Sequence, residues 1–120
     1  MKGKCSETNQ ISRTDIIRIY NILRDLGLKC STKGTTLINK AVQFVFISSS
    51  DFIVIDNIYK EIANYYKDIN VMQIQSYIKY AIKNRDEEKS RKNFYKIFGF
   101  EYDEYIFTNK CIIEEIARII

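Results

Sequence analysis

The amino-acid sequence predicts an all-α protein, a single domain of about six helices, and two observations favour this class. The chain of 120 residues contains no proline and only 4 glycines, which argues against a turn-rich β-sandwich. Hydrophobic residues make up 46% of it, with 9 Tyr and 7 Phe, enough to form one sizeable core. We therefore expect helices separated by polar capping residues, with no linker that divides the chain.

Residues 1–11 are polar and show no periodicity, so we expect a flexible N-terminal arm followed by a helical domain at 12–120. The first helix is predicted to begin where Ser12 and Asp15 resemble a capping box, and to stop at Gly27. Its inward stripe is predicted to consist of Ile16, Ile19, Tyr20, Leu23 and Leu26.

A second helix is predicted at 35–48, and because its second half is apolar nearly all round we expect it to be central and buried. A strand at 42–47 is the alternative, since β-branched and aromatic residues dominate that stretch. The helical spacing of the residues before it favours the helix. The aligned apolar residues are Leu37, Ala41, Phe44 and Val45.

A turn at 48–51, ending at Asp51, is predicted to precede a third helix at 52–66. The inward face of that helix is predicted to consist of Ile55, Ile58, Tyr59, Ile62 and Tyr66. Residues 67–70 then interrupt the apolar pattern, so the third helix is expected to end there.

Asn70 is expected to cap a fourth helix at 71–84, which is followed by a charged hinge at 85–89 and a fifth helix at 90–98. Residues 101–107 are predicted to form a loop or a short extended piece. The last helix is predicted at 110–120, with a cap at Thr108 or Asn109 and an inner face of Ile112 or Ile113, Ile116 and Ile120.

Several function classes are disfavoured by residue types that the sequence lacks. There is no histidine, which removes the commonest general base and the commonest zinc ligand, and there is no Walker loop or GxGxxG motif. We therefore expect no enzyme activity, no metal and no cofactor. The three cysteines show no CxxC spacing, and no apolar run or secretory leader is visible, so we expect free thiols in a cytoplasmic protein that does not contact a membrane.

The stretch from about 58 to 84 has the order of a helix-turn-helix: a helix, a short break and a second helix. Ala63 is small enough for the close helix crossing that this motif needs. On a helical wheel centred on Lys79, one face of the second helix carries no carboxylate. This face comprises Met72, Gln75, Ser76, Lys79 and Lys83, with Gln73 and Tyr80 at its margin. Ile74, Tyr77, Ile78 and Ala81 are expected to pack inward.

The residue types on this outward face suit the major groove of DNA. Gln pairs with adenine, Ser serves donor or acceptor edges, and Lys contacts guanine or phosphate. Residues 67–96 contain eight Lys or Arg against four Asp or Glu, within a chain of net charge +4, whereas 97–120 contain two against five. The outward face and the segment after it are therefore basic, which favours a polyanion as partner.

The sequence resembles the C-terminal DNA-binding effector domain of the sporulation stage-zero master response regulator. The resemblance runs from Ile16 to Ala117 and rests on the order and spacing of several segments. These are "LGLKCSTKGTTLINKAV" (26–42), "IYKEIANYY" (58–66), "IKYAI" (78–82), "IFG" (97–99) and "TNKCIIEEIA" (108–117).

The resemblance implies six helices, with a helix-turn-helix in the third and fourth, and sequence-specific binding to double-stranded promoter DNA, often as paired copies. It also implies transcription regulation through contact with RNA polymerase holoenzyme. The positions that match the family's base-contacting segment are Gln73, Gln75, Ser76, Lys79 and Tyr80. The residues that we expect at DNA phosphates are Lys33, Lys67, Lys83, Arg85, Lys89, Arg91 and Lys92, with Lys33 and Gly34 matching the Lys-Gly of the family loop.

This sequence departs from the family in the helix that contacts the bases. The family's helix is richer in Arg and includes a His, where this chain has Gln73, Ser76, Lys79 and Tyr80. Arg forms a bidentate pair with guanine that these side chains do not reproduce, so the family's target sequence does not carry over. Eleven residues before the first helix are too few for the family's receiver domain. We therefore expect constitutive DNA binding or regulation through an associated partner.

A protein-interaction module is the alternative that the sequence leaves open. In that case the chain keeps the fold but modulates another regulator, for example by sequestering it, without binding promoter DNA. The low Arg content of the 71–84 helix and the acidic C-terminal segment favour this alternative.

Overall fold

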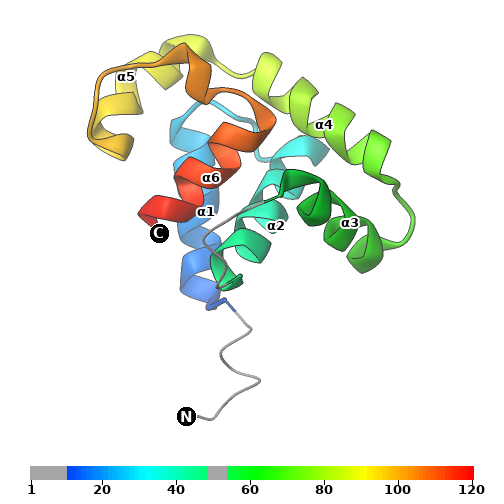
Figure 1. Cartoon of the computed structure of the whole chain (residues 1–120). Helices are drawn as coiled ribbons and strands as arrows, with labels where there is room; N and C mark the ends of the chain where they lie inside the picture. Colours follow the sequence, from blue (N-terminus) through cyan, green and yellow to red (C-terminus); the bar gives the residue numbers. More distant parts are fainter. Residues whose placement is uncertain (1–10, 49–53) are drawn as a thin grey trace, which may run out of the picture.

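Six α-helices and one short 3-10 turn form the fold of the computed structural model, which describes residues 11–48 and 54–120 (Figure 1). None of the described residues forms a strand, so the predicted all-α class is confirmed and the alternative strand at 42–47 is wrong. The elements are α1 (Arg13–Asp25), α2 (Lys33–Ile47), α3 (Ile55–Tyr66), α4 (Val71–Lys83), α5 (Glu87–Phe98), η2 (Glu104–Ile106) and α6 (Asn109–Ile119). No helix in these ranges is both long and apolar enough to cross a membrane.

Helix α2 lies at the centre of the fold and packs against α1, α3, α4 and α6. Its buried residues lie between Gly34 and Val42, among them Leu37, Ile38 and Ala41. The prediction of a central helix is confirmed, but its apolar second half is buried only at its start, since Val42 is fully buried whereas Phe46 is 41% exposed. The reason is that α4 crosses α2 near its start, at Gly34, and covers the first turns.

Polar caps set the helix boundaries largely where the sequence predicts them. Ser12 Oγ accepts a hydrogen bond from the Asp15 backbone N–H (3.1 Å) at the start of α1. Thr108 Oγ1 accepts one from the Cys111 N–H (3.2 Å) at the start of α6, which decides between the two predicted caps. The inward residues predicted for α1 and α3 are buried or half-buried in the core.

Three predictions for the C-terminal third need correction. Helix α5 starts at Glu87, three residues before the predicted start, because the Asp86 carboxylate accepts the Lys89 N–H and caps it. The segment 101–107 contains the 3-10 turn η2, capped by Asp103. In α6 both Ile112 and Ile113 are fully buried, rather than one of the two.

Some predictions fall on parts of the chain outside the described ranges. The predicted flexible arm lies outside the described residues except for Ile11, which packs against the core. The turn ending at Asp51 also lies outside them, apart from Ser48, the C-cap of α2. Cys30 and Cys111 are free thiols.

Candidate nucleic-acid interface

Helices α3 and α4 are joined by the four residues 67–70, which lie at one end of the pair (Figure 1). Lys67 takes a left-handed conformation (φ 68°), and its N–H donates to the Ala63 carbonyl (2.9 Å), closing α3. Ile69 is buried and anchors the turn to the core. The chain therefore reverses direction within four residues and sends α4 out across α2.

Asn70 caps α4 as predicted, and it does so in a reciprocal capping box with Gln73, which was not predicted. The Asn70 Oδ1 accepts from the Gln73 N–H (2.8 Å), and the Gln73 Oε1 accepts from the Asn70 N–H (2.9 Å). Gln73, one of the predicted base-contacting residues, is thus also part of the helix cap. Its carbonyl oxygen is committed to the backbone, while its amide nitrogen is not part of this box.

The inward face of α4 differs from the prediction at two positions, Tyr77 and Ile82. Ile74, Ile78 and Ala81 are buried as expected, but Tyr77 is 38% exposed and Ile82 is buried in its stead. The Tyr77 backbone lies where α2 comes closest, since a Cβ atom added to Gly34 would lie 2.0 Å from the Tyr77 carbonyl oxygen. The Tyr77 ring lies at the edge instead, with Lys33 Nζ 5.2 Å from its centroid.

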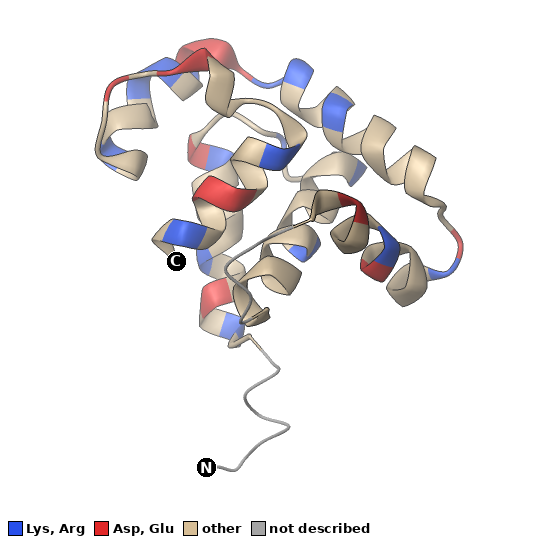
Figure 2. Ribbon diagram, viewed as in Figure 1, with Lys and Arg blue, Asp and Glu red and all other residues tan. Residues whose placement is uncertain are grey.

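Four of the five predicted base-contacting residues are exposed on α4: Gln73, Ser76, Lys79 and Tyr80. The fifth, Gln75, is half-buried, and its carbonyl accepts a hydrogen bond from Asn109 Nδ2 (3.2 Å). Met72 and Tyr80 are 74% and 61% exposed. No acidic residue interrupts α4, and its two lysines lie in its second half (Figure 2).

The predicted phosphate-contacting residues fall into two groups. Lys33, Lys67, Lys83 and Lys92 are exposed, and Lys89 is half-buried. The two arginines are held by other protein groups. Arg91 forms an ion pair with Glu87 (2.9 Å) and lies over the Tyr102 ring, 4.4 Å from its centroid. Its pKa is raised, mainly by the hydrogen bond from its guanidinium to Glu87.

Arg85 joins the end of α4 to α5 and to the segment before α6. Its guanidinium donates to the Ile82 carbonyl (3.0 Å), to Ser90 Oγ (2.9 Å) and to the Tyr102 hydroxyl (3.1 Å). It also lies over the Phe107 ring, 3.8 Å from the centroid. These contacts engage Nε, Nη1 and Nη2, so Arg85 holds α4, α5 and the segment before α6 together.

The start of α6 lies beside α4, a contact that the sequence does not predict. Asn109 Nδ2 donates to the Tyr59 hydroxyl and to the Gln75 carbonyl, both at 3.2 Å, and so ties α6 to α3 and α4. The pKa of Tyr59 is raised, mainly because the side chain is buried. The nearby charge of Asp56 adds to this effect, and the hydrogen bond from Asn109 opposes it. No sequence pattern marks this contact, because its partners lie 34 and 50 positions from Asn109.

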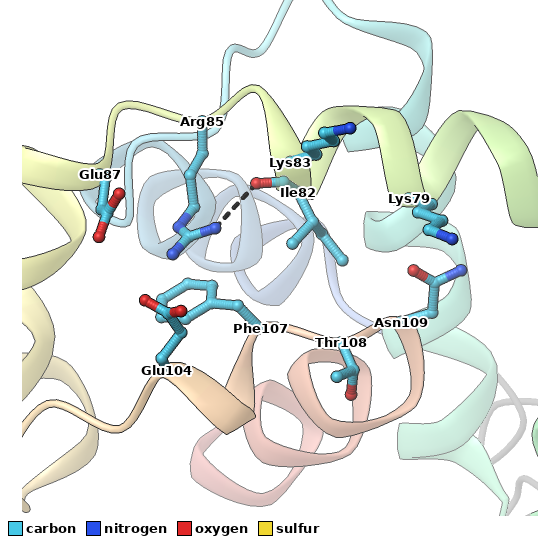
Figure 3. Close-up of a pocket in the computed structure, with 9 residues that line it drawn as sticks. All are labelled: Lys79, Ile82, Lys83, Arg85, Glu87, Glu104, Phe107, Thr108 and Asn109. Carbon is cyan, nitrogen blue, oxygen red and sulfur yellow. Dashed lines mark hydrogen bonds between the residues drawn. The ribbon is translucent and has the colours of Figure 1, made fainter.

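A hollow of about 440 Å³ separates the second half of α4 from the start of α6 (Figure 3). Lys79 points across it toward Asn109, whereas Lys83 points away from it. Arg85 and Phe107 close one end, where Glu87 and Glu104 also lie. The hollow is lined by lysine, arginine and glutamate side chains, so it carries both signs of charge. Helix α4, in contrast, contains no acidic residue.

Comparison with protein-family models, curated proteins and solved structures finds no match to this chain. The resemblance to the sporulation regulator family therefore stays a prediction that rests on the quoted sequence segments alone.

Proposed function

We propose that this chain is a sequence-specific DNA-binding protein, a transcription regulator whose α3, four-residue turn and α4 act as a helix-turn-helix. In this proposal α4 enters the major groove, and its outer face contacts base edges through Gln73, Ser76, Lys79 and Tyr80. Gln75, half-buried against α6, contacts DNA only at the margin of that face.

One observation carries the proposal: the exposed face of α4 bears amide, hydroxyl, phenol and ammonium groups and no carboxylate over its 13 residues. An exposed face of a soluble helix ordinarily mixes both signs of charge. A face without acidic groups avoids repulsion by the phosphates that flank the groove. Its hydrogen-bonding groups suit the exposed donors and acceptors of base pairs.

The exposed lysines at the two ends of α4 are placed to contact phosphates. Lys67 lies in the turn before α4 and Lys83 in its last turn, so the two flank the face. Because one such domain buries little surface, we expect two copies on DNA, with half-sites spaced by whole helical turns. Contact with RNA polymerase holoenzyme is the route of regulation that the family resemblance suggests.

A titration of DNA fragments over a series of salt concentrations tests this function. Log affinity falls with log salt concentration, and each phosphate contact that is lost makes this negative slope less steep by about 1. We expect Lys83→Ala and Lys67→Ala each to show this decrease. Lys96→Ala, an exposed lysine at the end of α5, serves as the control and should leave the slope unchanged. Binding without sequence preference at every salt concentration would contradict the proposal.

A protein-binding role for the same face is the second candidate, and the exposure of Met72 and Tyr80 favours it. Large apolar side chains at a solvent-exposed helix face are typical of helix–partner contacts. Lys79→Glu separates the two candidates, since a negative charge in the major groove opposes DNA binding at any sequence. The protein-binding role would be favoured if Lys79→Glu still captured a helical partner as well as the wild type does, and if the wild type bound no DNA.

A further inference from the structure

The first two turns of α4 border a shallow hollow of about 320 Å³ on the outer face. Asn70, Met72, Gln73, Ser76 and Tyr77 line it. It lies at the N-terminal end of the helix, the part that contacts base edges when a helix-turn-helix docks in the major groove. Its chemistry therefore bears on which base the protein prefers, provided that the proposed function holds.

The capping box determines which hydrogen-bonding group Gln73 presents to this hollow. Its Oε1 accepts the Asn70 N–H at 2.9 Å, so the carbonyl end of the amide is turned back toward the helix start. The other end of the amide carries two N–H donors. Pairing with adenine needs both a donor and an acceptor from one amide, and the cap occupies the acceptor. Gln73 therefore offers donors to a base.

Met72 places an apolar group beside these donors. It precedes Gln73 in the chain, lines the same hollow and is 74% exposed. Its unbranched thioether adapts to irregular apolar surfaces. The hollow therefore combines a fixed hydrogen-bond donor with an adaptable apolar side chain.

Among the four bases, thymine matches this combination in the major groove. It presents the O4 acceptor next to the C5 methyl group, whereas guanine presents two acceptors and no methyl group. Cytosine presents an N4 donor, which would oppose the Gln73 donors, and adenine pairs a donor with an acceptor. The absence of carboxylates on α4 makes the surrounding surface compatible with the DNA backbone.

The geometry points to a thymine-specific subsite at the start of α4, in which Gln73 Nε2 donates to O4 and Met72 packs against the C5 methyl group. This inference rests on the proposed DNA-binding function and adds to it a base identity and the residues that select it. The preference is set by a side chain that the fold itself orients through the Asn70 cap.

Replacement of thymine by deoxyuridine tests the methyl contact, because it removes the methyl group and keeps the O4 acceptor. A preferred duplex is first selected from a random library, and each thymine in it is then replaced singly. We expect one position in each half-site where uracil weakens binding roughly three- to fivefold, the effect of one buried methyl group. Met72→Ala should abolish this penalty, whereas Tyr95→Ala, a substitution of an exposed large side chain on α5, should retain it.

Gln73→Glu tests the donor without removing the helix cap. A glutamate keeps the oxygen that accepts the Asn70 N–H, since Glu is a standard residue at this position of a capping box. Its outward oxygen is an acceptor, which suits the N4 amino group of cytosine. We expect the selected base at the uracil-sensitive position to change from thymine to cytosine. A loss of affinity that is equal for all sequences, with no change of base, would overturn the assignment of Gln73.

The remaining outcomes separate this inference from the function beneath it. Selective binding in which uracil is tolerated at every thymine would overturn the subsite and leave the DNA-binding function intact. A uracil penalty that persists in Met72→Ala would overturn the assignment of Met72. A selection that returns no preferred sequence would overturn the DNA-binding function and the subsite together.

Discussion

Gly34 of α2 and Tyr77 of α4 meet backbone to backbone: a Cβ atom on Gly34 would lie 2.0 Å from the Tyr77 carbonyl oxygen and 2.7 Å from the Ala81 Cβ. No side chain fits between the two helices at this point. The crossing holds the middle of α4 on the core and so sets which of its side chains face outward. Gly34, which the family resemblance matches to a loop glycine, has this packing role in the first turn of α2.

Gly34→Ala is expected to destabilise the protein strongly, because the methyl group would collide with backbone that cannot move independently. We expect a decrease of about 3 kcal/mol in the free energy of unfolding, at the upper end of the usual cost of overpacking. Urea denaturation followed by circular dichroism measures it.

Gly99→Ala is the matched control for that measurement. Gly99 has a positive φ of 84°, and no other atom lies within 4 Å of the position that an added methyl group would take, so only backbone strain opposes the substitution. We expect a cost of about 1 kcal/mol there. A Gly34→Ala protein as stable as Gly99→Ala would show that α2 and α4 are not in close contact.

Local patterns in the sequence are sufficient to predict most helix boundaries. Ser12 and Asn70 are caps whose side chains act on N–H groups three residues ahead, so their role is encoded in a short stretch. Ile74 and Ile78 face the core at the spacing that helical periodicity requires. The predicted start of α5 is wrong because its charged first turn resembles a hinge, although acidic residues are favourable at a helix N-terminus.

Contacts between segments that are distant in the sequence cannot be predicted from local patterns. Tyr77 occupies an inward position on the helical wheel, yet its side chain is 38% exposed where the backbones of α2 and α4 meet. Arg85 resembles one more basic residue near the helix end, but its partner Tyr102 lies 17 positions further on. The half-buried state of Gln75 depends on Asn109, 34 positions away. Each of these outcomes requires the tertiary arrangement.

Arg85→Ala is expected to reduce stability, since it removes three hydrogen bonds and the contact with Phe107. We expect a loss of about 2 kcal/mol in the free energy of unfolding. Lys83→Ala, two residues away and exposed, should change stability by less than about 0.5 kcal/mol. The structural role of Arg85 would be contradicted if Arg85→Ala had wild-type stability and lost as much DNA affinity as Lys83→Ala.

Asn70→Ala is expected to fray the first turn of α4, because the Gln73 N–H loses its acceptor. The typical cost of losing such a cap is about 1 kcal/mol. Amide hydrogen exchange should accelerate in the first turn of α4 and remain unchanged in α6, which Thr108 caps separately. Asn70→Ser, which keeps a side-chain acceptor, should restore most of the protection. Equal exchange rates in the alanine and serine variants would show that the cap does not hold the helix start.

Contact between the outer face of α4 and base pairs is best tested by selecting bound duplexes from a random library. The wild type and the variants Ser76→Ala and Lys79→Ala are each selected, with Lys96→Ala as the control. We predict one recurring sequence for the wild type and for Lys96→Ala, and a loss of preference at one or two adjoining positions for each α4 variant. No recurring sequence for the wild type, or a sequence that every α4 variant leaves unchanged, would contradict this contact.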